Sequence, residues 1–135
     1  MENQLTGQCL CGEVSYTLAD NFKNFYQCHC KQCRQLTGSA FASNILTDPD
    51  NIEWLSGQNN IAAFQHPTRD FSSSFCRICG SALSFVNKSR TSLIVPARSL
   101  NDLPSIQPQA KLFNSEEAPW LQVGLRARKF EGFAE

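Results

Sequence analysis

Alternating apolar and polar positions along the chain predict short strands rather than long helices. Residues 13–18 alternate in this way, which is the two-residue period of a half-buried strand. Residues 71–75 alternate too, and with residues 61–65 they predict a hairpin joined by the five residues 66–70. Further strand candidates are residues 83–86 and 93–95. The pattern therefore favours a β-rich fold.

Helical signals are weak. The best candidate covers residues 31–36 and ends near Gly38, since glycine commonly stops a helix. Residues 101–104 are expected to hold one short turn, and residues 48–51 and 56–57 are turn sequences. We expect a mainly β, single-domain protein spanning residues 1–135, because no linker is long enough to divide the chain.

Charge and hydropathy exclude some classes of protein. The formal net charge is zero. The densest basic cluster, Arg126, Arg128 and Lys129, is interpreted as a solvated tail. We therefore expect no nucleic-acid partner. No apolar run approaches the roughly 18 residues of a membrane span, so no membrane partner is expected. Residues 1–4 lack the basic and apolar stretches of a signal peptide, so a reducing, cytoplasmic location is expected.

The seven cysteines stand in three tight clusters. In order along the chain they are Cys9 and Cys11; Cys28, Cys30 and Cys33; and Cys76 and Cys79. Thiolates two or three residues apart can turn toward one ion, and tetrahedral Zn²⁺ is the usual occupant of such sites. Cysteines this close in sequence rarely reach the Cα separation of roughly 5.5 Å that an unstrained disulfide needs.

The odd number of thiols suggests how they divide. A closed structural zinc takes four ligands, whereas a reactive zinc takes three and leaves one position open. Cys28, Cys30 and Cys33 are contiguous and form the candidate reactive set, and the other four cysteines form the candidate structural zinc site. For the reactive set the alternatives are a second zinc closed by a fourth protein ligand, without chemistry, and a free redox-active thiol set.

The two histidines are weaker candidates. Extended backbone places Cys28 and Cys30 on one face and turns His29 away, which makes His29 an awkward ligand. His66 lies in a polar turn and is expected to be solvated rather than to act as a general base.

A zinc held by three thiolates suits a particular chemistry. Three thiolates and Zn²⁺ carry a net −1, and a coordinated exogenous thiol is deprotonated outright. Such a thiolate can attack a small carbonyl, so the site suits making or breaking a carbon–sulfur bond. The same site could instead polarise a carbonyl as a Lewis acid.

Three sequence motifs resemble those of the glutathione-dependent formaldehyde-activating enzyme family, which shares its domain with centromere protein V. The motifs are residues 7–12 (GQCLCG), 28–34 (CHCKQCR) and 75–81 (FCRICGS), and residues 118–120 (APW) look like a late family motif. The resemblance runs from about residue 7 to residue 123, and all seven cysteines match in order and spacing. Residue 111 is lysine where the family often has histidine, and residues 98–101 replace a small, glycine-containing turn.

The resemblance implies a β-tent fold of small antiparallel sheets held by two zinc ions. It implies a structural zinc at Cys9, Cys11, Cys76 and Cys79 and a reactive zinc at Cys28, Cys30 and Cys33, with no separate cofactor-binding residues. Because open sites lose metal more readily than closed ones, the reactive site is expected to be partly empty in purified protein.

The family further implies a carbon–sulfur lyase that joins or cleaves a glutathione-like thiol and an aldehyde such as formaldehyde. The alternative is a non-catalytic, zinc-stabilised binding module with two structural metals. Arg34 is a candidate for binding a glutathione carboxylate and Trp120 for walling the pocket, although a surface arginine and a core tryptophan are the simpler roles. The thiol, the aldehyde and the oligomeric state do not follow from the sequence.

Overall fold

The structure, a computed structural model, describes residues 3–134. Residues 1 and 2, which contributed to the signal-peptide expectation, lie outside the described residues, as does Glu135. The strands are β1 (Gln4–Gln8), β2 (Ser15–Ala19), β3 (Asn24–Cys28), β4 (Ala42–Thr47), β5 (Glu53–Ser56), β6 (Ile61–Gln65), β7 (Ser72–Cys76), β8 (Ala82–Leu83), β9 (Phe85–Val86), β10 (Leu93–Pro96) and β11 (Ala110–Leu112). The helices are α1 (Lys31–Thr37), α2 (Leu121–Leu125) and the 3-10 turns η1 (Gln58–Asn60), η2 (Ala97–Ser99) and η3 (Asn114–Glu116).

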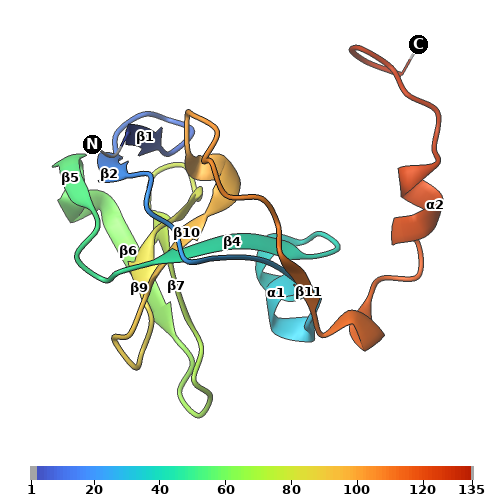
Figure 1. Cartoon of the computed structure of the whole chain (residues 1–135), viewed down its shortest axis with the longest axis horizontal. Coiled ribbons are helices and arrows are strands. Elements are labelled where there is room, and N and C mark those ends of the chain that lie inside the picture. Colours follow the sequence, from blue (N-terminus) through green and yellow to red (C-terminus); the bar gives the residue numbers. More distant parts are fainter. Residues whose placement is uncertain (1–2, 135) are drawn as a thin grey trace.

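The strands form three small sheets, as the mainly β prediction required. Their orders are β1-β2-β5, β11-β3-β4-β10-β9 and β6-β7-β8. Neighbouring strands are antiparallel except for β11, which pairs with β3 in parallel. In Figure 1, β4 crosses the middle of the molecule, and the hairpin of β6 and β7 extends below it.

The main core lies between the five-stranded sheet and the β1-β2-β5 sheet. Ile45, Leu93 and Val95 point from the five-stranded sheet into this core, where they meet Leu5, Tyr16 and Leu18 of β1 and β2. These side chains are at most 6% exposed. Alternation of side chains across a strand means that their neighbours Leu46 and Ile94 face the other side of the sheet. That second face borders the candidate site described below.

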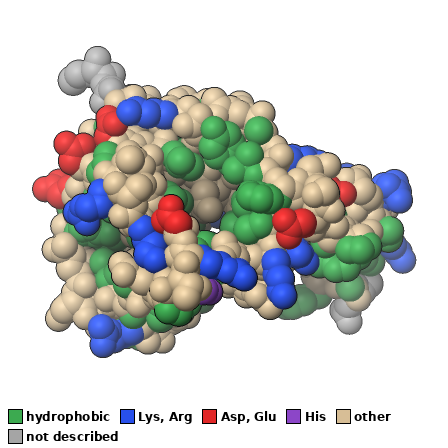
Figure 2. All heavy atoms as spheres, turned by 90° about the horizontal axis from the view of Figure 1, so that it is seen from below, with side chains coloured by type: hydrophobic (Ala, Val, Ile, Leu, Met, Phe, Trp, Pro, Cys, Tyr) green, Lys and Arg blue, Asp and Glu red, His purple; other side chains and the backbone are tan. Residues whose placement is uncertain are grey.

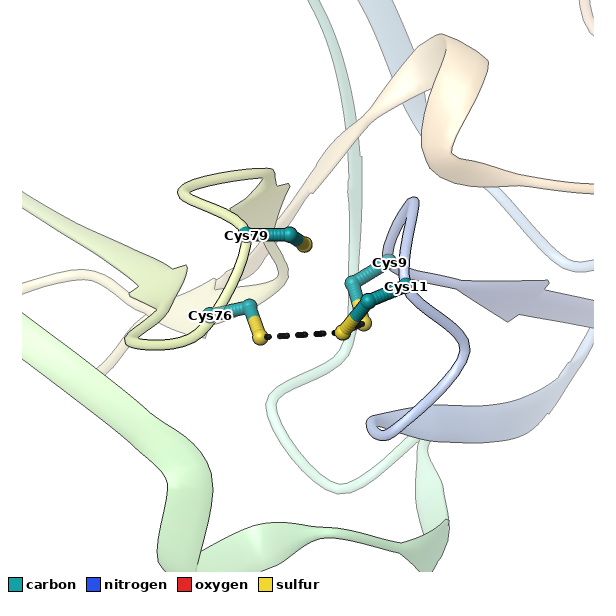
Figure 3. A group of neighbouring side chains, drawn as sticks. All are labelled: Cys9, Cys11, Cys76 and Cys79. Carbon is teal, nitrogen blue, oxygen red and sulfur yellow. Dashed lines mark hydrogen bonds between the residues drawn. The ribbon is translucent and has the colours of Figure 1, made fainter.

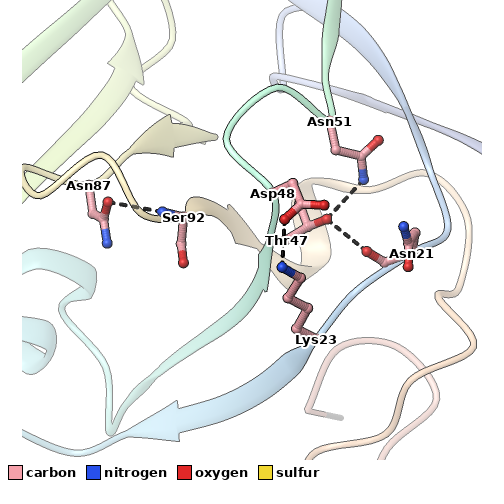
Figure 4. A network of polar contacts seen from close by, with 7 residues as sticks. All are labelled: Asn21, Lys23, Thr47, Asp48, Asn51, Asn87 and Ser92. Atoms are coloured by element: carbon pink, nitrogen blue, oxygen red, sulfur yellow. Dashed lines mark hydrogen bonds and ion pairs between the residues drawn. The ribbon is translucent and has the colours of Figure 1, made fainter.

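A polar network joins the start of β3 to the end of β4 (Figure 4). The hydroxyl of Thr47 donates to the carbonyl oxygen of Asn21 at 2.7 Å and accepts from the amide of Asn51 at 3.0 Å. Lys23 forms an ion pair with Asp48 at 2.6 Å nearby. Thr47 is 1% exposed, so these bonds satisfy a hydroxyl that is buried at the rim of the core.

The C-terminal segment projects away from the sheets (Figure 1). Several apolar side chains on it are exposed, namely Trp120, Val123, Leu125, Phe130 and Phe133. Figure 2 shows this segment as a lobe on the right, and apolar side chains border one side of a hollow near the middle of the same face. Among residues 3–134, no helix is long and apolar enough to cross a membrane. Residues 101–104, expected to hold a short turn, follow η2 and contain no helix.

Candidate metal centres

The first cysteine cluster joins two segments that are far apart in the sequence. Cys9 and Cys11 follow β1, while Cys76 ends β7 and Cys79 lies in the turn before β8. Their Sγ atoms all lie within 4.8 Å of one another. The Sγ atoms of Cys9 and Cys11 are 3.5 Å apart, and those of Cys11 and Cys76 are 3.8 Å apart (Figure 3).

Each of the two turns that carry these thiols ends in a glycine that bonds back to the first cysteine of the turn. Gly12 has a φ of 82° and donates its N–H to the carbonyl of Cys9; Gly80 has a φ of 79° and donates to the carbonyl of Cys76. Positive φ favours glycine, which accounts for its place after each pair of cysteines. The hydroxyl of Ser81 accepts from the N–H of Leu10 at 2.9 Å and so connects the two turns directly.

The pKa values of thiols within this four-cysteine cluster differ widely. The hydroxyl of Ser81, 3.2 Å from Cys79 Sγ, and the N–H groups of Cys11 and Ser81 lower the pKa of Cys79 to about 5. For Cys11, the N–H of Glu13 lowers the pKa, but burial and the thiols of Cys9, Cys79 and Cys76 raise it to about 12. Some sulfurs therefore carry negative charge while others stay protonated. A divalent cation would allow all of them to ionise.

The second cluster lies where β3 runs into α1. Cys28 ends β3, Cys30 is the N-cap residue of α1, and Cys33 lies in the first turn of that helix. The three Sγ atoms lie within 4.8 Å of one another. The Sγ of Cys30 accepts a hydrogen bond from the N–H of Cys33 at 3.4 Å, so the helix cap itself brings two of the sulfurs together. α1 ends at Gly38, which has a φ of 66°, as the sequence predicted.

His29 points away from the thiols. Its ring is fully buried and packs against Phe41, with ring centroids 5.0 Å apart. Neither ring nitrogen has a hydrogen-bond partner among the described residues. The His66 Nδ1 atom accepts from the N–H groups of Thr68 and Arg69 at 3.2 and 3.1 Å, so this histidine stabilises a turn.

Arg34 and Glu116 hold the three-cysteine turn in place. The Nε atom of Arg34 donates to the carbonyl of His29 at 3.0 Å, and its Nη2 atom lies 3.8 Å from the carboxylate of Glu116. That carboxylate also accepts from the N–H of Lys31 at 3.2 Å. The guanidinium considered for a substrate carboxylate is therefore engaged with the protein. Glu116 had no signal in the sequence, because it comes from a segment 85 residues away from Lys31.

The three thiols differ in their affinity for protons. Burial raises the pKa of Cys33, and the sulfurs of Cys28 and Cys30 raise it further. Burial also raises the pKa of Cys30, but the N–H of Cys33 and the neighbouring thiols outweigh it, and the pKa of Cys30 is lowered overall. Burial is the main reason why the pKa of Cys28 is raised. Among these three thiols, Cys30 therefore loses its proton most readily.

A cavity of about 320 Å³ opens beside the three-cysteine cluster. Cys28 and Cys33 form part of its wall. The remaining lining residues are Tyr26, Asn44, Leu46, Asp70, Phe71, Ser72, Phe85, Asn87, Lys88, Ile94 and Leu112. Trp120, considered for this wall, is not among them and is 59% exposed.

Both clusters fit a tetrahedral metal ion. With metal–sulfur bonds of about 2.3 Å, the edge of a regular tetrahedron measures about 3.8 Å. The Sγ separations of 3.5 and 3.8 Å in the four-cysteine cluster lie close to this value. Each group could hold a metal ion. The three-cysteine cluster supplies one ligand fewer and adjoins a cavity, so a small molecule could reach a metal ion there.

Comparison with known proteins agrees with this geometry. Residues 4–116 match the family described as glutathione-dependent formaldehyde-activating enzyme. The fold resembles a crystal structure of a Rhodobacter sphaeroides protein with a TM-score of 0.57 and 22% sequence identity, over 79% of this chain and 98% of that chain. No curated protein matches the chain.

Proposed function

The chain belongs to the glutathione-dependent formaldehyde-activating enzyme family, and from this premise we propose that it is a zinc-dependent enzyme of the carbon–sulfur lyase type. Its reaction joins or cleaves a small, glutathione-like thiol and an aldehyde such as formaldehyde. The observation that carries the proposal is the placement of Cys28 and Cys33 in the wall of a cavity, within 4.8 Å of a third thiol at Cys30.

The two cysteine clusters have different proposed roles. Cys9, Cys11, Cys76 and Cys79 hold a structural zinc that joins β1 to the hairpin of β7 and β8, with an affinity that adds about 10 kcal/mol to folding. Cys28, Cys30 and Cys33 hold the reactive zinc. Bound there, zinc supplies a coordination position for an exogenous thiol and keeps that thiol deprotonated at neutral pH.

The protein positions the reacting groups and excludes water from them. Arg34 and Glu116 fix the turn that carries the thiols, and the cavity brings the carbonyl carbon next to the sulfur. In the forward direction a sulfur–carbon bond forms and the carbonyl π bond breaks, while the proton lost by the thiol is returned to the carbonyl oxygen. We place this activity in a reducing, cytoplasmic compartment, where thiols remain free to bind metal.

Calorimetric titration of glutathione into zinc-loaded protein, with zinc content measured on the same sample, tests the proposal. We expect saturable binding of about one glutathione per chain. S-methylglutathione, which has no free thiol, is the matched control and should bind far more weakly. Cys33→Ser should abolish glutathione binding while the circular dichroism spectrum stays close to that of the wild type.

Two results would contradict this function. Equal affinity for glutathione and S-methylglutathione would mean that the thiol does not reach a metal. Absence of binding with two zinc ions present would favour a non-catalytic module in which both metals are structural.

A further inference from the structure

The cavity beside Cys28 and Cys33 has an apolar floor formed by one face of the five-stranded sheet. Tyr26 and Cys28 lie on the same face of β3, because side chains two residues apart share a side. Strand pairing places Leu112 opposite Cys28, and Leu46 opposite Ile94. Tyr26, Leu46, Ile94 and Leu112 all line the cavity. Asn44, which is paired with Tyr26, adds one amide to this face, and the rest of the floor is apolar from the thiols outward.

The roof of the cavity is held in place by side-chain hydrogen bonds. It includes Phe71, which follows the 66–70 loop between β6 and β7. Lys88 Nζ donates to the carbonyl oxygens of His66 and Arg69 at 2.9 and 2.8 Å. Arg69 in turn donates to Gln32 Oε1 on α1 at 2.8 Å. The cavity is therefore formed before a ligand binds, and its size is set by the folded protein.

Charge inside the cavity does not suit an anionic ligand. Asp70 and Lys88 are its charged lining residues. Two of the three Lys88 donors already bind backbone carbonyls, and the Asp70 carboxylate would repel a carboxylate of the substrate. A charged peptide-like thiol would therefore leave its carboxylates outside in solvent.

The size of the cavity also exceeds what formaldehyde needs. Its volume of about 320 Å³ compares with about 30 Å³ for one water molecule, and formaldehyde has only two non-hydrogen atoms. A cavity of this size and character usually encloses an apolar group.

We propose that this cavity takes an uncharged apolar group, such as a short alkyl chain or a phenyl ring, carried on the aldehyde carbon that becomes bonded to sulfur. This inference rests on the proposed function and specifies its carbonyl substrate. The thiol R–SH adds to R′–CHO to give R–S–CH(OH)–R′; the sulfur–carbon bond forms, the π bond breaks and the thiol proton passes to oxygen. R′ occupies the cavity and R extends toward solvent.

The affinities of alkanethiols test whether the cavity takes an apolar chain, without any measurement of catalysis. In an alkanethiol, the carbon bonded to sulfur takes the place of the aldehyde carbon of the adduct, so the rest of the chain stands in for R′. For zinc-loaded protein, we expect the affinity to rise about fourfold for each methylene buried, or about sixtyfold from ethanethiol to 1-pentanethiol. With glutathione as the thiol, the ratio of the catalysed to the uncatalysed rate should also rise as the aldehyde chain lengthens from formaldehyde to pentanal.

Ile94 provides the matched variants. Ile94→Trp, and the milder Ile94→Phe, fill the cavity and should remove most of the gain in affinity with chain length. Leu55→Trp makes a similar change on β5, where the side chain is 57% exposed, and should preserve the gain.

The outcomes separate this inference from the function on which it rests. If ethanethiol or glutathione binds but longer chains gain nothing, or if the gain persists in both Ile94 variants, the apolar substrate is excluded and the thiol site stands. If no thiol binds to zinc-loaded protein, both proposals fail.

Discussion

At the scale of single residues, the packing of Gly7 against Tyr16 shows how closely β1 and β2 approach. The two residues are paired across the strands. Tyr16 is fully buried, its hydroxyl lies 2.6 Å from that of Ser99, and its ring meets Trp54 edge to face with centroids 5.4 Å apart. A Cβ atom at position 7 would overlap the Tyr16 ring. Because Gly7 has no side chain, the Tyr16 ring can pack directly against the β1 backbone in the core.

Gly7→Ala is expected to destabilise the protein. Either the ring of Tyr16 or the β1 backbone must move, and such overpacking costs about 1–3 kcal/mol. Urea denaturation of the zinc-loaded protein measures the loss. Gln8→Ala is the control, because this side chain is exposed on the same strand and its loss should change the unfolding free energy by less than about 0.5 kcal/mol. Equal stability of Gly7→Ala and wild type would show that the strands can separate without cost.

Sequence reasoning succeeds for residues whose chemistry is local. Cys28, Cys30 and Cys33 are close in sequence, so their spacing alone predicts that they meet. The extended backbone predicts that His29 turns away from them, although its complete burial was not predicted. Glu116 could not be found in this way. Its role depends on the parallel pairing of β11 with β3, which brings the segment after β11 to the start of α1.

At the scale of elements, the hairpin of β6 and β7 does two things at once. Its loop of residues 66–70 leads into the roof of the cavity, and its far end delivers Cys76 to the four-cysteine cluster. Lys88 crosslinks the loop through two carbonyl oxygens. The hairpin therefore couples the shape of the cavity to a segment that is fixed at the other end by the proposed structural zinc.

Lys88→Met should loosen this loop. We expect the amides of residues 66–70 to exchange hydrogen faster, the dependence of thiol affinity on chain length to weaken, and the unfolding free energy to fall by about 1 kcal/mol or less. Hydrogen-exchange mass spectrometry of the loop is the direct measurement. Lys23→Met is the control, since it removes an exposed lysine paired with Asp48 rather than with the loop. Unchanged exchange in Lys88→Met would mean that the roof is held by other contacts.

Residues 93–95 were predicted as a strand and form β10, whereas residues 83–86, predicted as one strand, form β8 and β9 in two different sheets. β2, the β6–β7 hairpin and α1 were found close to their observed bounds. β3 was not, because every residue in it is half-buried: the core covers one face and the cavity borders the other, so no alternation appears. β11 has only three residues and could not be recognised without its partner strand.

At the scale of the whole molecule, the fold is defined by contacts between distant segments. Cys11 and Cys76 are 65 residues apart, yet their sulfurs lie 3.8 Å from each other and connect the β1-β2-β5 sheet to the β6-β7-β8 sheet. The division of seven thiols into four and three was expected from their number and spacing, and the structure groups them in this way. The cavity could not be expected, because its floor and roof come from different sheets that meet only in the folded chain.

The central claim is that these seven cysteines form one closed and one open zinc site. Native mass spectrometry of the zinc-loaded wild type, Cys33→Ser and Cys79→Ser tests this most directly. We predict two zinc ions on the wild-type chain, one on a folded Cys33→Ser chain, and loss of zinc together with a broadened, unfolded charge-state distribution for Cys79→Ser. A wild-type chain that holds a single zinc, or a Cys33→Ser chain that keeps two, would contradict the account.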